Sequence, residues 1–274
     1  MADGTLSAPP SNGKKLKVVI ATQNSPLFLP TYLDKILHHA GHSVVAILVL
    51  PSFEGPSVMA KKTWGLFGAP VFLYLGFQIA FGKIWDHLLL FMGFHSRFSV
   101  RGVARRYGIP VVKTKNINAM MTLTQLREME PDIIFSLAAP QKFEAEVLSL
   151  PKRGCFNIHS SLLPAYRGIN AIFWAMLHGE QQTGFTIHKM SADLDCGPVI
   201  WQETVPIESG ESYFTVCRKV IERGAPAVAR FLNLQEDAIC LGKNLEKSAR
   251  YFGFPTAADR RQFYSRGGKF LSFF

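Results

Sequence analysis

The sequence predicts an α/β domain whose sheet is mostly parallel and is flanked by helices. Three apolar runs of strand length carry this prediction, at 17–22, 43–50 and 133–137. Runs without a polar face are typical of strands that are covered on both sides, as in parallel sheets. Between the first two runs, 30–40 has helical spacing and ends before Gly41. Strand, helix and strand in this order indicate a Rossmann-like domain.

The other elements follow from the same signals, taken along the chain. Helices are expected over 99–107, 118–129, 169–178 and 212–232, and short strands over 109–112, 155–159 and 185–190. Asn118 is expected to cap the second of these helices. The turn 23–26 after the first strand lacks a G-x-G-x-x-G pattern, so no dinucleotide site is expected there.

Composition limits the classes of partner. The chain has 274 residues, 48% of them hydrophobic and 18% charged, which is enough for one large domain with a core. A formal net charge of +10 favours phosphates, nucleic acid or an acidic membrane surface, and ordinary solubility is the alternative. No metal site is expected, because neither the histidines nor the cysteines show metal-ligand spacing. The four cysteines predict reduced thiols and a cytoplasmic location: Cys155, Cys196, Cys217 and Cys240.

The stretch from Cys155 to Ile200 carries the predicted chemistry. In a strand, side chains two apart share a face, so Asn157 and His159 point one way while Phe156 and Ile158 point the other. An amide can donate to a developing oxyanion, and an imidazole can exchange a proton near neutral pH. Asp195 follows in a loop between two apolar strands. Its carboxylate could orient the imidazole and favour the charged ring.

The full pattern resembles the formyltransferase family, which includes glycinamide ribonucleotide, methionyl-tRNA and sugar N-formyltransferases. The resemblance covers about residues 15–235 and is strongest over 131–207. Three ordered motifs carry it: Asn157-x-His159-x-Ser-Leu-Leu-Pro-x-x-Arg167-Gly168, Thr183-Gly-x-Thr-x-His188, and Asp195-x-Gly-Pro-x-Ile200. The resemblance implies the formyltransferase fold and a catalytic triad of Asn157, His159 and Asp195.

By the same resemblance, the co-substrate is 10-formyltetrahydrofolate and the acceptor is a primary amine. The folate would be held by Pro140, Gln141 and Phe143 together with Ala192, Asp193 and Leu194. Arg167 and Gly168 would lie on the acceptor side of the site. Many relatives have proline where this chain has Ala171, and His188 matches a family histidine that we interpret as structural support.

The implied domain plan is a catalytic domain over 15–242, between a flexible tail over 1–14 and a basic, aromatic extension over 243–274. The extension can bind a membrane surface or nucleic acid. However, tRNA formyltransferases carry a sizeable C-terminal β domain, which about thirty residues cannot supply. No nucleic-acid partner is therefore expected.

The apolar insert at 56–96 departs from the family. Residues 64–82 contain no charged side chain, and Gly65, Gly68, Pro70 and Gly76 predict a broken helix. A transmembrane span is one interpretation, although it would divide the sheet domain. A buried hairpin or an oligomer interface is the second. Peripheral membrane contact through 64–92 is the one that we favour.

These observations predict an N-formyltransferase that acts on an anionic, nucleotide-linked or lipid-linked amino sugar, with peripheral contact to the inner face of the membrane. Two alternatives stay open at this point. A formyltetrahydrofolate hydrolase would use the same triad with water in place of the amine. A non-catalytic membrane scaffold would keep only the fold. The identity of the acceptor and the oligomeric state are not fixed by the sequence.

Overall fold

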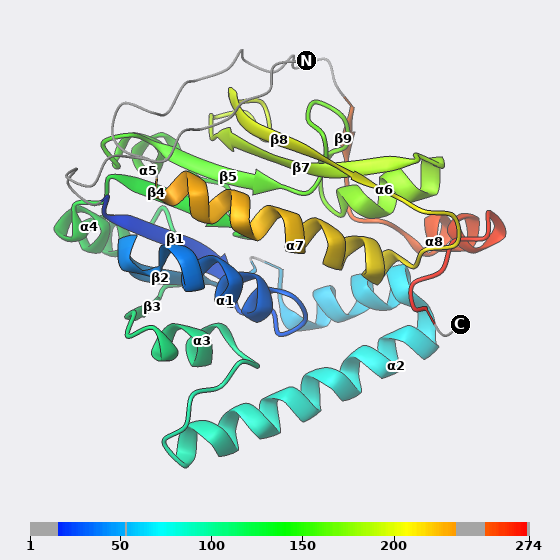
Figure 1. Ribbon diagram of the computed structural model, residues 1–274, viewed down its shortest axis with the longest axis horizontal. Helices are drawn as coiled ribbons and strands as arrows, with labels where there is room; N and C mark the ends of the chain where they lie inside the picture. The colour runs from blue at the N-terminus through cyan, green and yellow to red at the C-terminus, as the bar shows by residue number, and fades with distance from the viewer. Residues whose placement is uncertain (1–15, 53, 234–249, 273–274) are drawn as a thin grey trace.

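The computed structural model describes residues 16–272, apart from 53 and 234–249 (Figure 1). The tail predicted over 1–14, Cys240 and the beginning of the C-terminal extension lie outside the described residues. The described chain contains a seven-stranded sheet with helices on both faces. The predicted fold class is therefore confirmed.

The sheet has the strand order β3-β2-β1-β4-β5-β7-β8. The five strands from β3 to β5 run parallel, and β7 pairs antiparallel with both β5 and β8. The strands are β1 (Val18–Gln23), β2 (Val44–Leu50), β3 (Val111–Lys113), β4 (Ile133–Leu137), β5 (Cys155–His159), β7 (Gln182–Lys189) and β8 (Val199–Pro206). A separate two-stranded sheet pairs β6 (Arg167–Gly168) with β9 (Tyr251–Phe252).

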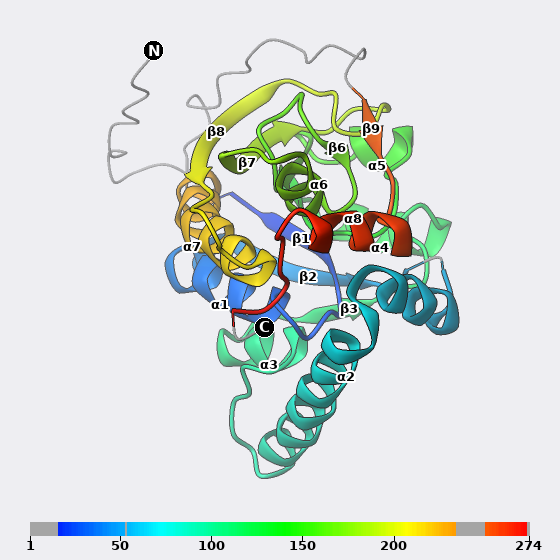
Figure 2. The same cartoon turned by 90° about the vertical axis from the view of Figure 1, so that its right-hand side faces the viewer.

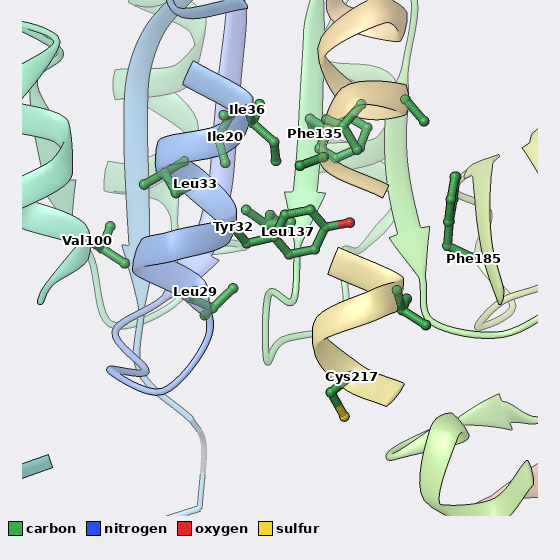
Figure 3. Packing of buried hydrophobic residues seen from close by; sticks show 14 of the residues in the cluster. Ile20, Leu29, Tyr32, Leu33, Ile36, Val100, Phe135, Leu137, Phe185 and Cys217 are labelled. Carbon is green, nitrogen blue, oxygen red and sulfur yellow. The ribbon is translucent and has the colours of Figure 1, made fainter. Parts of the chain in front are cut away.

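Side-chain alternation divides the core between the two faces of the sheet. Val18 and Ile20 of β1 pack on the side of α1 (Leu29–Ala40), α3 (Val100–Arg106) and α7 (Tyr213–Leu232). Figure 3 shows α1 and α7 on this side, with Phe135 of β4 beside them. Val19 and Ala21 pack on the other side, against α4 (Met120–Met129) and α5 (Ala145–Ser149). Apolar residues on both faces explain why these strands lack a polar period.

The helix α4 begins differently from its prediction. Ala119 is its N-cap residue, and Asn118 does not cap it. Asn118 instead donates through Nδ2 to the Lys142 carbonyl at 3.0 Å, and its Oδ1 accepts from the Glu144 N–H at 3.0 Å. The side chain therefore ties the start of the helix to the loop after β4, because that loop offers both a donor and an acceptor.

The C-terminal extension packs into the domain. Its helix α8 (Ala257–Ser265) begins with a capping box between Thr256 and Asp259. Phe263 and Phe270 are fully buried against Phe173 of α6 (Ala171–His178). These aromatic side chains, which suggested a binding surface in the sequence, are core residues.

The apolar insert forms α2 (Pro56–Phe91), a helix of 36 residues with a sharp kink. Gly68 breaks it, with φ 73° and ψ 173°, and Pro70 follows; Gly76 lies within regular helix. Before the kink, Arg260 of α8 donates to the carbonyls of Trp64 and Gly65, both at 2.8 Å. After the kink, residues 69–91 leave the body of the domain; we call them the distal arm (Figure 2).

Candidate active site

The strand β5 places Asn157 and His159 on the same face, while Phe156 and Ile158 pack toward α7. Asn157 pairs with His188 of the antiparallel strand β7, and His159 pairs with Thr186. A two-residue period and this register bring an amide and two imidazoles to one end of the sheet.

The ring of His159 is oriented by a backbone carbonyl. Its Nε2 lies 2.9 Å from the carbonyl oxygen of Tyr166, and a carbonyl only accepts, so Nε2 carries a hydrogen. The other ring nitrogen, Nδ1, lies 3.7 Å from Oδ1 of Asp195. The side chain is 8% exposed. His159 therefore points Nδ1 toward the Asp195 carboxylate, while its Nε2–H donates to the Tyr166 carbonyl.

Asp195 is held on a loop that folds back over β5. Its φ is 53°, in the left-handed region that non-glycine residues seldom occupy. Its Oδ2 accepts from the Gly168 N–H at 2.9 Å, which leaves Oδ1 facing His159. Arg167 holds the same loop by donating to the Leu194 carbonyl, at 2.7 Å from Nη2 and 3.2 Å from Nε.

His188 lies between Asn157 and Asp195. Its Nδ1 donates to the Lys189 carbonyl at 3.1 Å, so in the neutral ring Nε2 accepts from Asn157 Nδ2 at 3.2 Å. Burial lowers the pKa of His188 to about 4, against the opposing attraction of Asp195, whose Oδ1 lies 3.8 Å from Nε2. A neutral His188 fixes the orientation of the Asn157 amide and leaves its second N–H for another acceptor.

Two glycines are required by close backbone approaches beside Asp195. A Cβ on Gly168, whose φ is 107°, would lie 2.2 Å from the carbonyl oxygen of Phe252. A Cβ on Gly197 would lie 1.7 Å from the Lys189 carbonyl oxygen. Phe252 belongs to β9, so the C-terminal extension supports the strand whose amide holds Asp195.

The residues predicted to bind folate fall into two groups. Gln141 and Phe143 are buried: Gln141 accepts from the Ile117 N–H and donates to the carbonyls of Pro51 and Lys115, all at 2.9 Å. Their side chains therefore shape the loop from inside. Pro140 is half-buried after β4, and the other three residues are exposed in the loop before Asp195: Ala192, Asp193 and Leu194.

A cavity of about 280 Å³ lies between α1 and α7, and Ile158 and Ser160, the two sequence neighbours of His159, line it. Ser160 and Asn170 connect its lining to the His159 strand and to β6. Apolar side chains make up much of the remaining wall, among them Phe28, Leu29, Ile158, Phe185, Val220 and Ile221. Among the described residues, no group of three or more histidine, cysteine, aspartate or glutamate side chains could hold a metal ion.

Comparison with known sequences decides the family. The family model described as formyl transferase matches residues 16–232. The chain belongs to this family. It is 40% identical over 133 residues to the methionyl-tRNA formyltransferase of Kosmotoga olearia, a match that covers 48% of this chain and 43% of that protein. The chain thus matches less than half of that relative's length.

Solved structures share the formyltransferase fold at low identity. Glycinamide ribonucleotide transformylase 1 from Symbiobacterium toebii has a TM-score of 0.56 and 16% identity, over 85% of this chain and 95% of that one. WlaRD, a sugar 3N-formyl transferase crystallised in the presence of dTDP and 5-N-formyl-THF, has a TM-score of 0.53 and 18% identity, over 88% and 70%. The family and the fold that the motifs predicted are confirmed.

Several groups of this candidate site carry no sequence signal of their own. The Tyr166 carbonyl and the Gly168 amide are backbone groups, so residue type does not reveal them. Phe252 lies 84 residues beyond Gly168, and in the sequence the aromatic residues of the extension indicated a binding surface, not support for this strand. Arg167, predicted on the acceptor side, donates to the aspartate loop.

Proposed function

We propose that this chain transfers a formyl group from 10-formyltetrahydrofolate to a primary amine. The observation that carries the proposal is the convergence of Asn157, His159 and Asp195 within a formyl transferase family member. An amide donor, an imidazole and a carboxylate are the groups that direct attack of an amine on a formyl carbon requires.

The proposed reaction needs no nucleophile from the protein. The amine nitrogen bonds to the formyl carbon, and the carbonyl electrons move onto oxygen. The second N–H of Asn157 and the Nδ1–H of a protonated His159, whose Nε2–H is held by the Tyr166 carbonyl, stabilise this oxyanion. When the carbon–N10 bond breaks, the electron pair returns to N10, which takes up a proton as the attacking nitrogen loses one. Asp195, whose Oδ1 faces His159, accepts the amine proton.

We assign the folate site to two loops, 138–143 after β4 and 190–194 before Asp195. Gln141 and Phe143 support the first loop from its buried side, whereas Pro140 is half-buried and Ala192, Asp193 and Leu194 are exposed to solvent. Backbone groups of both loops would therefore supply much of the contact with the pterin. The 5-N-formyl-THF present with the neighbour WlaRD supports a formyl-folate ligand.

The cavity between α1 and α7 supports a lipid-linked amino sugar as the acceptor. Its walls are largely apolar, yet the Asn170 Nδ2 on its border is buried without a hydrogen-bond partner. Tyr32 also lines it, and burial raises the pKa of this phenol, so the hydroxyl stays a donor. A lipid chain that carries an oxygen able to accept a hydrogen bond fits both the apolar wall and the donors of Asn170 and Tyr32. A nucleotide-linked amino sugar, suggested by the net charge of +10, is the second member of the proposed acceptor class.

The proposal also includes the place of the reaction. Buried free thiols at Cys155, Cys196 and Cys217 support a reducing, cytoplasmic compartment. Contact of residues 64–92 with the inner face of a membrane would bring the enzyme to a lipid-linked amine.

The test follows tetrahydrofolate release from 10-formyltetrahydrofolate with a panel of amines. The panel contains polyprenyl-phosphate amino sugars, nucleotide-linked amino sugars and plain amino sugars. Amine-dependent release that disappears in Asp195→Asn supports the transferase, and the best acceptor identifies the class. Release without amine would replace the proposal with a formyl-folate hydrolase. A protein that neither binds folate nor releases tetrahydrofolate would support the non-catalytic membrane scaffold instead.

A further inference from the structure

The distal arm of α2 is apolar on two opposite faces, of which the domain covers only one. Val71 and Leu75 are buried on its inner face, and Gly82 packs on Phe98. Six side chains follow the outer face at intervals of three and four residues and are between 41 and 84% exposed: Leu73, Phe77, Phe81, Ile84, Leu88 and Phe91. At 1.5 Å per residue this outer stripe is about 27 Å long. A helix that is apolar all round needs a second apolar environment.

Charge around the arm identifies that environment. Residues 54–107 contain seven lysines and arginines and two carboxylates, Glu54, which pairs with Lys62, and Asp86. Asp86 accepts from the Ser99 hydroxyl at 2.8 Å, so it belongs to the inner face. Lys61 and Lys83 are exposed before and along the arm, and the exposed Arg97, Arg101 and Arg105 follow its end, whereas Arg106 pairs with Asp34. An apolar stripe with cations at both ends complements a bilayer with anionic headgroups.

Two other occupants fit less well. A second copy of the chain would place cations against cations in either direction of helix pairing, because both ends of the arm are basic. A membrane-crossing helix is disfavoured because the arm is tied to the same domain at each end. Arg260 binds the carbonyls before Gly68, and Ser99 binds Asp86. Among the described helices, α2 alone is long and apolar enough to cross a membrane, by length and composition only.

We infer that the distal arm lies flat in the headgroup region of an anionic bilayer, with the outer stripe of six apolar side chains inserted and the flanking lysines and arginines against the headgroups. The kink at Gly68 separates the arm from the first part of α2, whose last residues, Leu66 and Phe67, are buried. Phe67 packs there on Phe214 and Phe270. This inference rests on the membrane location in the proposed function, and it adds which element makes the contact and which lipid it meets. The test of this contact needs no formyl transfer.

The test is co-sedimentation of the full chain with vesicles of phosphatidylcholine, with or without phosphatidylglycerol. We expect binding to the anionic vesicles, weakened by salt, because cations and anionic lipid attract each other through a screened field. Phe77→Asp with Ile84→Asp should lower the partition constant at least tenfold, since two inserted side chains become charged. The matched control is Met120→Asp with Met121→Asp on α4, whose side chains are equally exposed, and it should bind as the unaltered protein does.

A second readout places the arm itself at the lipid. Trp85 is 40% exposed on the arm, so its fluorescence should shift to the blue with anionic vesicles, and Trp85→Phe should remove most of this shift. Equal binding of the arm variant and the unaltered protein would overturn the inference, as would the absence of binding to either vesicle. A lipid-free dimer in light scattering that Phe77→Asp with Ile84→Asp dissociates would assign the outer stripe to a second copy instead.

Discussion

The site segment 155–197 and the distal arm of α2 use their side chains in opposite ways. In the site segment, His159, Asp195 and Arg167 each contact a partner within the chain, and even the backbone amide of Gly168 is used. On the arm, the large apolar side chains of the outer stripe are exposed, and the ring contacts that they make, Phe77 with Phe81 and Phe81 with Trp85, lie within the arm itself. The choice of residues in the first region is explained by contacts inside the chain. The choice in the second requires something outside it.

The largest expected effect separates the two regions by activity. His159→Asn should lower the rate of formyl transfer roughly 10²–10⁴-fold, because the general acid–base group is lost while a polar side chain remains. The measurement is tetrahydrofolate release with a soluble amine that the unaltered protein accepts. Phe77→Asp on the arm should leave this rate unchanged. Equal losses in both variants would contradict the division between a catalytic and a docking region.

The second prediction concerns stability at Gly168. Alanine there would have φ 107°, and its Cβ would lie 2.2 Å from the Phe252 carbonyl oxygen. We expect Gly168→Ala to reduce the free energy of unfolding by about 2–4 kcal/mol, since backbone strain and overlap with a fixed strand add. Urea denaturation measures it. A loss below about 0.5 kcal/mol would mean that β9 does not support the site as closely as the geometry indicates.

The contrast also shows how far the sequence alone could lead. The two-residue period placed Asn157 and His159 on one face, because a strand alternates its side chains whatever surrounds it. No local rule brings Asp195 to His159, since its loop is set by Gly197, Arg167 and the left-handed φ of Asp195. Residue chemistry alone suggested that this carboxylate could orient the imidazole, and the family resemblance placed both residues in one triad.

For the arm, the sequence revealed its apolar character and the break at Gly68, since glycine and proline act locally. The sequence could not reveal which face of the arm the domain covers, because nearly every position is apolar. No polar residues recur at helical spacing to mark an exposed face. Asn118 shows the same limit on a small scale. Its type permitted a helix cap, but Lys142 and Glu144, which the fold brings near it, supplied better partners.

The third prediction uses the pKa of His188. Burial lowers this pKa to about 4 in the folded chain, whereas an exposed histidine titrates near 6.5. As the pH falls below 6.5, the unfolded chain binds the proton first, so the stability due to neutral His188 is present above pH 6.5 and is lost toward pH 4. His188→Gln keeps an acceptor for Asn157 but cannot titrate.

We therefore expect the unfolding free energy of the unaltered protein to fall more steeply between pH 7 and 4.5 than that of His188→Gln, by on the order of 2 kcal/mol. Urea denaturation at the two pH values gives both slopes. His38→Gln on α1 is the matched control, because it removes another histidine far from the site segment. Parallel slopes for His188→Gln and the unaltered protein would show that His188 is not held neutral by its surroundings.

The smallest expected effect returns to glycine, now on the arm. Gly76 lies in regular helix with nothing within 4 Å of the position of a Cβ, in contrast to Gly168. Alanine loses less conformational entropy than glycine in a helix, so Gly76→Ala should stabilise the folded chain by about 0.5–1 kcal/mol, with a sign opposite to that at Gly168. Because Val71 and Leu75 attach the arm to the core, this gain should appear in the urea unfolding transition of the whole domain. A destabilised Gly76→Ala protein would mean that the arm is not a regular helix in solution, and the outer stripe would then lose the geometry on which the bilayer contact rests.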